Sequence, residues 1–271
     1  LPDYDDTRGR PECCRYDREV LSKVYDFGPL TPDQRRQARA DYYDLCTEVD
    51  AAVGRILAAL EATGLRDNTL VVFTSDHGNM LGEHGLMQKE TFYEQSVRVP
   101  LMFSCPDRLP ASGVIDEPVE TIDIMPTMLD AAGVPIPDSV DGESLLKLAR
   151  GDTSGWREFV QGEHTTCYTH EHGMQYITDG MEKYIWFHHT GEEQFFDLRE
   201  DPGECRDLSA SAVHAERIDR WRGRLAQINE TRGDPRGQNG QLVPQPEGAL
   251  RLSPFYERWK TRAQQAAKSW K

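Results

Sequence analysis

A long stretch beginning near residue 31 repeats apolar side chains every three or four positions, which is the spacing of one helical face. The repeating positions are Ala38, Tyr42, Leu45, Val49, Val53, Ile56 and Leu60. Thr31 and Pro32 supply an N-cap and a first-turn proline, and Gln34 completes a capping box. Gly64 suits a helix C-terminus, because glycine readily adopts the left-handed conformation found there. The pattern predicts a helix between Thr31 and Gly64.

Two shorter runs, residues 69–74 and 99–104, are apolar without alternation. Such runs are typical of strands that are buried on both faces of a parallel sheet. A helical segment over residues 122–132 follows, and Gly133 ends it. Two strands and two helices do not complete an α/β layer structure, so we expect further strands before Leu1.

The pattern changes after residue 155. Short strand candidates alternate with turn residues, at 159–160, 174–178, 183–188 and 194–197. Asp179-Gly180 and Thr190-Gly191 mark two of the turns, so this part predicts an antiparallel meander. A helix with apolar Ile218, Trp221, Leu225 and Ile228 is expected beside it. Residues 233–248, dense in Gly, Pro and Gln, are predicted to be a loop or linker.

These elements indicate the α/β class, divided into two parts. Residues 1–155 are predicted to form part of a mixed sheet sandwiched by helices. Residues 156–271 are predicted to form a small antiparallel-sheet subdomain with a helix and a tail. The length of 271 residues and the hydrophobic content of 38% allow a substantial core.

Composition narrows the possible partners. The chain has 31 Lys and Arg residues against 46 Asp and Glu residues, a formal charge of -15, which argues against nucleic-acid binding. An anionic substrate stays possible, because a few basic groups and a metal set the local field. No apolar run is long enough for a transmembrane helix. The first residues match neither a start methionine nor a signal peptide, so the compartment is unknown.

Candidate chemistry follows the first apolar run, at Asp76 and His77. Ligands of α/β sheets bind beyond the carboxyl ends of strands, and a carboxylate beside an imidazole suits a divalent cation. An Asx-turn at a strand end explains the same residues equally well. The loop that follows holds three glycines and leads to Lys89. A lysine beside a metal suits hydrolysis of a sulfate or phosphate ester, where negative charge must be stabilised.

The residues around this pair resemble the second signature region of sulfatases, within the alkaline-phosphatase-like superfamily. The resemblance rests on Thr74-Ser75-Asp76-His77-Gly78, Leu81-Gly82-Glu83-His84-Gly85, Lys89, Tyr93-Glu94 and Arg98-Val99-Pro100. Further matches occur, in family order, at residues 42–54, 122–133, 141–145, 183–185, 195–198 and 201–204. The chain is identified as the C-terminal portion of a sulfatase. The resemblance implies a partial alkaline-phosphatase-like sheet.

The resemblance also implies a mechanism. In sulfatases a cysteine in a C-x-P-S-R motif becomes formylglycine, whose hydrate attacks sulfur, and a divalent metal holds the sulfate oxygens. By resemblance Asp76 and His77 are metal ligands, with Ca²⁺ expected and Mn²⁺ or Mg²⁺ as alternatives. His77 has a catalytic role as ligand or as hydrogen-bond donor, because some relatives carry Asn there. Lys89 binds the sulfate or assists departure of the leaving group.

The chain departs from the family pattern in two ways. No cysteine lies in a C-x-P-S-R motif, and Cys105-Pro106-Asp107-Arg108, the nearest match, follows a predicted strand and is interpreted as structural. The family's N-terminal pair of aspartates is also absent. We therefore expect the formylglycine and the other metal ligands upstream of this chain, which alone should be inactive.

Other histidines are weaker candidates. His84 in the glycine-rich loop and His164 after Glu163 are candidate substrate-binding residues. The alternatives are a solvated loop histidine for His84 and a strand-end polar cluster for Glu163 and His164. Four further histidines have no ligand spacing and are predicted to lie at the surface: His170, His172, His188 and His189.

Three functions are consistent with these residues. The leading hypothesis is metal-dependent hydrolysis of a sulfate ester, of the arylsulfatase or carbohydrate sulfatase type. Its partner would be a small-molecule or carbohydrate sulfate ester. The second is a phosphonate or phosphodiester hydrolase of the same superfamily. The third is a non-catalytic fragment that serves as a binding module.

Overall fold

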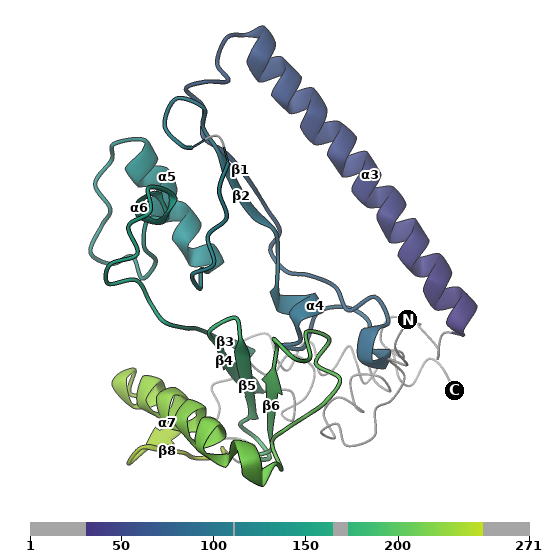
Figure 1. Ribbon diagram of the computed structural model, residues 1–271, viewed down its shortest axis with the longest axis vertical. Helices are drawn as coiled ribbons and strands as arrows, with labels where there is room; N and C mark the ends of the chain where they lie inside the picture. The colour runs from purple at the N-terminus through teal and green to yellow at the C-terminus, as the bar shows by residue number, and fades with distance from the viewer. Residues whose placement is uncertain (1–30, 111, 165–172, 246–271) are drawn as a thin grey trace, which may run out of the picture. The chain divides into compact units, whose positions relative to one another are not determined.

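A computed structural model of the chain describes residues 31–110, 112–164 and 173–245 (Figure 1). The chain divides into two compact units. We call residues 32–78 and 98–160 the hairpin unit. The other, called the sheet unit, contains the described residues 79–97, 161–164 and 173–245. No helix among the described residues is long and apolar enough to cross a membrane.

The hairpin unit begins with the predicted long helix, α3, at Pro32–Ala62. Gly64 has a φ of 69°, and its N–H donates to the Glu61 carbonyl, which ends the helix as expected. None of the 31 residues of α3, all of which the structure describes, is buried. The apolar side chains of Leu45, Val49 and Ile56 are all exposed.

The two apolar runs form strands β1, Val71–Thr74, and β2, Leu101–Ser104, but the expected parallel pairing is wrong. They pair antiparallel, with Val71 opposite Ser104 and Thr74 opposite Leu101. Expected burial on both faces is also wrong, because Met102 is 57% exposed. An apolar run predicts a strand but not its direction, since both sheet types accommodate the same side chains.

The rest of the hairpin unit comprises η3, Thr121–Asp123, α5, Ile124–Ala131, and α6, Leu146–Ala149. The predicted helix over 122–132 is thus present, and Gly133 follows it with a φ of 70°. A small core gathers the buried side chains of Leu145, Leu148 and Trp156. Buried Asp123 accepts hydrogen bonds of 2.9 and 2.7 Å from the two Arg157 guanidinium nitrogens, which anchors the segment after α6.

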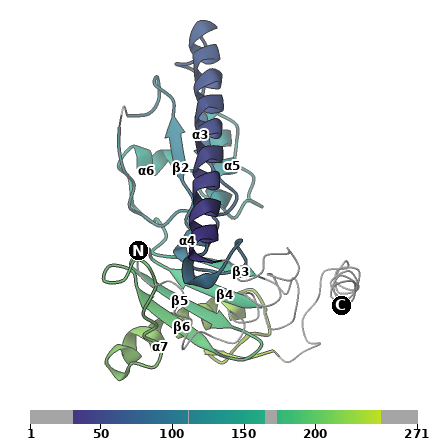
Figure 2. The same cartoon turned by 90° about the vertical axis from the view of Figure 1, so that its right-hand side faces the viewer.

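The predicted meander forms one four-stranded sheet in the order β3-β4-β5-β6 (Figure 2). The strands span Val160–His164, Met174–Thr178, Glu182–Phe187 and Glu193–Asp197. β5 pairs antiparallel with both β4 and β6. The Asp179-Gly180 turn works as predicted, because Gly180 has a φ of 84° and Asp179 accepts the N–H groups of Met181 and Glu182.

A short turn, η5, Ala212–His214, leads into α7, Ala215–Thr231, the predicted second amphipathic helix. α7 buries Ile218, Trp221 and Leu225 and contacts β4 and β5. The stretch expected to be a loop contains two short strands, β7, Gly237–Gln238, and β8, Gln241–Leu242, which pair as a hairpin. Gly240, with a φ of 72°, supplies the left-handed turn residue that this hairpin needs.

Residues 79–97, which we call the lysine loop, pack against the four-stranded sheet. The loop contains η2, Glu83–Gly85, and α4, Glu94–Val97. Its buried side chains form one core with residues of the sheet: Met80, Leu86, Phe92, Tyr93, Met174, Ile185, Phe187, Phe196 and Leu198. The loop therefore takes its place from the sheet unit. The division of the whole protein at residues 155 and 156 stays a prediction.

Candidate functional site

Asp76 and His77 follow β1 directly and are held by a local turn. The His77 backbone N–H donates to Asp76 Oδ1 over 3.0 Å, and the Ser75 hydroxyl donates to the His77 carbonyl over 2.8 Å. The hydrogen bond from the His77 N–H lowers the pKa of the Asp76 carboxyl below its usual value. This carboxylate is therefore ionised near neutral pH. Its side chain is 83% exposed, so it faces solvent rather than the core.

The His77 ring has a defined orientation. Its Nδ1 lies 2.8 Å from the Gly78 carbonyl oxygen, which only accepts, so Nδ1 carries the proton. Its Nε2 lies 3.4 Å from Asp76 Oδ2. In the neutral ring, His77 Nε2 and Asp76 Oδ2 both carry lone pairs that face each other and repel. A proton on Nε2, or a cation bound between the two atoms, removes this repulsion. Asp76 and His77 thus fit as two neighbouring ligands of a divalent cation.

Several residues of the lysine loop have a left-handed backbone conformation. Leu81, His84 and Gln88 have φ values of 47°, 54° and 69°, although each carries a side chain, and Gly82 and Gly85 also have positive φ. Each such side-chain-bearing residue costs about 1–3 kcal/mol and persists only where its surroundings hold it. Backbone hydrogen bonds across the loop and the buried side chain of Met80 hold it here.

Lys89 lies at the end of this tight segment. Its carbonyl accepts a 2.6 Å hydrogen bond from the Ser96 hydroxyl, and its N–H donates to Glu90 over 3.1 Å. Ser96 and Glu90 are both buried, so the backbone of Lys89 is fixed on both sides. Among the described residues, no carboxylate lies within ion-pair distance of the Lys89 ammonium group.

His84 lies on the inner side of the lysine loop. Its side chain is buried, and its ring stacks on the Tyr93 ring with 4.4 Å between the centroids. The alternative of a solvated loop histidine is therefore wrong. The left-handed backbone at His84 turns the ring toward the sheet, which a periodicity argument does not reveal.

His164 is the last residue of β3 and is half-buried. Its neighbour Glu163 accepts a 2.8 Å hydrogen bond from Arg236, which also pairs with Asp234. Gln175 lies 3.4 Å from the same Glu163 carboxylate. Glu163 therefore belongs to a strand-end polar cluster, one of the two interpretations of this segment.

His188 contradicts the prediction of a surface histidine. It is 1% exposed, and burial lowers the pKa of its ring to about 4. The ring occupies the space beside Gly173, where any Cβ would collide with it. His189 is half-buried, and His170 and His172 lie outside the described residues. The described part of the chain contains no group of three or more His, Cys, Asp or Glu side chains that could hold a metal ion.

Lys183 is a buried charged residue that the sequence did not single out. Its ammonium group lies 2.6 Å from Glu94 Oε1 and 2.9 Å from Glu204 Oε1, and it donates to the Phe92 carbonyl over 2.9 Å. We call Lys183, Glu94 and Glu204 the Lys183 cluster. A lysine in the middle of a strand is usually solvated, so the sequence offers no signal of this role.

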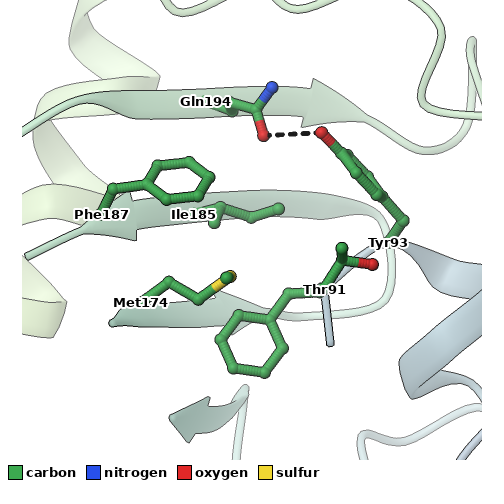
Figure 3. A pocket seen from close by; sticks show the side chains of 7 residues that line it. Thr91, Tyr93, Met174, Ile185, Phe187 and Gln194 are labelled. Atoms are coloured by element: carbon green, nitrogen blue, oxygen red, sulfur yellow. Dashed lines mark hydrogen bonds between the residues drawn. The ribbon is translucent and has the colours of Figure 1, made fainter. Parts of the chain in front are cut away.

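Tyr93 packs beside this cluster. Figure 3 shows its ring above the sheet, with its hydroxyl donating to Gln194 Oε1 over 3.1 Å. Met174, Ile185 and Phe187 line the same space. Two neighbouring residues, Tyr93 and Glu94, thus attach the lysine loop to the sheet, the first by its ring and hydroxyl and the second by an ion pair.

The structure places the predicted residues in two groups. Asp76 and His77 lie together at the end of β1, in the hairpin unit. His84 and Lys89 lie in the lysine loop, and His164 ends β3, all in the sheet unit. Cys105, the cysteine of the near-match motif, is a buried free thiol directly after β2, in agreement with its structural interpretation.

The model of the family described as Sulfatase matches residues 11–134. The model described as N-sulphoglucosamine sulphohydrolase, C-terminal, matches residues 82–231, more than half of the chain. The chain belongs to the sulfatase family.

Two curated relatives support this membership. The chain is 42% identical to an arylsulfatase of Clostridium perfringens over 213 residues, which cover 78% of this chain and 43% of the relative. It is 37% identical to PehA of Trinickia caryophylli, described as a multifunctional alkaline phosphatase superfamily protein, over 69% of this chain and 39% of the relative. The chain thus spans less than half the length of these relatives.

Solved structures agree with the fold. One is BT4656 in complex with its substrate D-glucosamine-2-N,6-O-disulfate, with a TM-score of 0.67 and 27% identity over 80% of this chain and 46% of that one. Another is the phosphonate monoester hydrolase SpPMH of Silicibacter pomeroyi, with a TM-score of 0.70 and 27% identity over 85% of this chain and 49% of that one.

Proposed function

We propose that the complete protein hydrolyses sulfate esters, with Asp76 and His77 as metal ligands and Lys89 as the group that binds the sulfate. The observation that carries this proposal is the Asp76 and His77 pair. A carboxylate oxygen and an imidazole nitrogen face each other over 3.4 Å at the end of a strand. The Gly78 carbonyl holds the imidazole proton on the far nitrogen. That arrangement presents two lone pairs to one cation.

Asp76 and His77 perform complementary tasks in this proposal. The low pKa of the Asp76 carboxyl keeps it ionised, so it binds a cation without first losing a proton. His77 would bind the cation through Nε2, which lies beside Asp76 Oδ2. A divalent metal bound there would polarise the sulfate oxygens as a Lewis acid. We propose Ca²⁺, with Mn²⁺ or Mg²⁺ as alternatives, because a carboxylate ligand suits all three cations.

Lys89 supplies positive charge without a carboxylate partner among the described residues. Charge grows on the ester's leaving oxygen as the sulfur–oxygen bond breaks, and a fixed ammonium group stabilises it. The strained and well-anchored loop supports this role, since a charge that is already in place costs no reorganisation during the reaction. We further propose formylglycine as the nucleophile of the complete protein, and His84 and His164 as substrate-binding residues.

The relatives that the chain resembles suggest the substrate class. Similarity to an arylsulfatase, to the N-sulphoglucosamine sulphohydrolase model and to a protein solved with a disulfated glucosamine supports aryl or carbohydrate sulfates. A phosphonate or phosphodiester substrate is the second candidate. The likeness to the phosphonate monoester hydrolase SpPMH favours it.

Paired assays on the complete protein test both candidates. Turnover of 4-nitrophenyl sulfate and of phenyl 4-nitrophenyl phosphonate is measured after metal removal and reloading with Ca²⁺ or Mn²⁺. We expect kcat/KM for the sulfate to exceed that for the phosphonate and to require the metal. Dominant phosphonate turnover supports the second candidate. Metal-independent turnover, or equal turnover by Asp76→Ala, contradicts the proposed site.

A further inference from the structure

The Lys183 cluster is a compact ionic contact in the sheet unit. Lys183 and Glu204 are both fully buried, and Glu94 is half-buried. Besides the two ion pairs to Lys183, Glu204 accepts the Glu94 backbone N–H over 2.6 Å. Burial raises the pKa of Glu204, and the Lys183 charge opposes this shift. The contact therefore joins β5, the turn after β6 and the first residue of α4.

A short covalent and hydrogen-bonded path connects this cluster to Lys89. Glu94 begins α4, and Ser96 lies two residues further in the same helical turn. The Ser96 hydroxyl donates to the Lys89 carbonyl over 2.6 Å. Ser96 is 3% exposed, so water does not readily replace this bond. The position of α4 thus sets the position of the Lys89 backbone.

The hydrogen bonds and ion pairs of the Lys183 cluster are directional, unlike the apolar contacts that pack the rest of the lysine loop. Apolar contacts of Met80 and Leu86 hold the loop against the sheet, but they allow sliding because they have no preferred direction. Charged hydrogen bonds fix distance and angle. A lysine that must meet one anionic group needs such a reference, since a misplacement of about 1 Å costs roughly 100-fold in rate.

We propose that Ser96 and Lys183 are positioning residues, which hold Lys89 at the place where it meets the anionic group of the substrate. This inference rests on the proposed function, because it assumes that Lys89 contacts the sulfate. Lys183 itself is buried and touches no substrate. It acts through Glu94 and α4, and Ser96 makes the last contact in the path.

A double-mutant cycle in the complete protein tests the inference. Ser96→Ala removes the hydroxyl and leaves the Lys183 cluster intact. We expect kcat for 4-nitrophenyl sulfate to fall roughly 10- to 100-fold, with KM changed much less. We expect Ser96→Thr, which keeps a hydroxyl, to recover most of this loss. In a Lys89→Ala background, Ser96→Ala should add almost nothing, since Ser96 acts on turnover only by placing the Lys89 ammonium group, which that background already lacks.

Thr178→Val is the matched control. Thr178 is also buried in the sheet unit, and its hydroxyl donates to the Glu182 carbonyl over 2.7 Å and accepts the Gly180 N–H over 3.0 Å, with no bond to the lysine loop among those recorded for the described residues. We expect this variant to change thermal stability about as much as Ser96→Ala while kcat per folded molecule stays the same. Equal losses of kcat in both variants would mean that Ser96 has a merely structural role.

Glu94→Gln tests the part of the path that starts at Lys183. It weakens one ion pair while Glu204 still pairs with the buried ammonium group, so the chain is expected to fold. We expect a smaller loss of kcat than for Ser96→Ala, again absent in the Lys89→Ala background. Additive losses overturn the positioning role. If Lys89→Ala alone leaves turnover unchanged, the proposed role of Lys89 fails, and the positioning role fails with it.

Discussion

The two units of the chain differ in how far they bury their apolar residues. In the sheet unit, the lysine loop and the β-strands share a buried core, and α7 buries Trp221 completely. In the hairpin unit, the 31-residue helix α3 buries none of its residues, and a small core cluster of described residues surrounds Trp156. An amphipathic helix gains most of its stability from packing its apolar face. The sheet unit therefore holds more of its stability within the described residues.

The same difference separates the two groups of candidate site residues. Asp76 and His77 are held by a local turn and are open to solvent. Lys89 is held by buried Ser96 of its own loop, and that loop is held in turn by distant Lys183. We therefore expect substitutions near Lys89 to affect folding, and substitutions of Asp76 to affect ligand binding alone.

Lys183→Met should have the largest effect on stability. It leaves Glu94 and Glu204 without their buried cation, and breaking a buried ion pair costs about 3–5 kcal/mol. Urea unfolding, followed by circular dichroism, measures the change. Arg220→Met is the control, since the Arg220 side chain is half-exposed and its partner Glu182 keeps a hydrogen bond from Trp221. Equal losses for the two variants would show that the Lys183 cluster contributes no special stability.

Acid should weaken the sheet unit through His188. In the fold its pKa is about 4, below the ordinary 6.5, because burial disfavours the charged ring. The unfolded chain therefore binds a proton between these pH values that the folded chain does not. Stability that is fully present above pH 6.5 is lost as the pH falls toward 4, by roughly 3 kcal/mol.

Replacing the ring removes this pH dependence. His188→Gln should flatten the change in unfolding free energy between pH 6.5 and 4, measured by urea titration at several pH values. The nearby charges of Asp234 and Arg236 remain in this variant and serve as an internal control. If the unfolding free energy of the variant falls with pH as steeply as that of the parent chain, other groups cause the acid sensitivity.

Asp76→Ala should separate binding from folding. We expect the affinity for the divalent metal, measured by isothermal titration calorimetry on the complete protein, to fall roughly 100-fold or more. Replacing a residue that only hydrogen-bonds to a metal ligand already lowers metal affinity by roughly 10- to 100-fold, so losing the ligand itself should cost at least as much. The urea midpoint without metal should stay unchanged, because the side chain is exposed and bonded only within its own turn. A shifted midpoint with unchanged affinity would make the turn structural.

The smallest effect is expected on α3. Val49 is exposed, so Val49→Ser in the 271-residue chain should change the unfolding free energy by less than about 0.5 kcal/mol. Trp221→Ala in α7 provides the contrast, because removing a fully buried tryptophan costs about 3–5 kcal/mol. A large loss for Val49→Ser would show that the apolar face of α3 is covered in solution.

Local patterns predicted much of the fold. The three-and-four spacing before Gly64 gave α3, and turn residues such as Asp179 and Gly180 gave the meander, because both depend on neighbours in sequence. Asp76 and His77 were found for the same reason, as a short motif after an apolar run. The antiparallel pairing of β1 and β2 was missed, since strand direction depends on residues far away in the chain.

By itself, the sequence determined the local elements, the sulfatase resemblance and the candidate pair at Asp76 and His77. Only the tertiary structure decided that His84 and His188 are buried and that the lysine loop lies on the four-stranded sheet. It alone also joined Lys183 to Glu94, 89 positions earlier in the chain. Periodicity reports which face of an element is apolar, whereas burial and ion pairing depend on which distant segment covers that face.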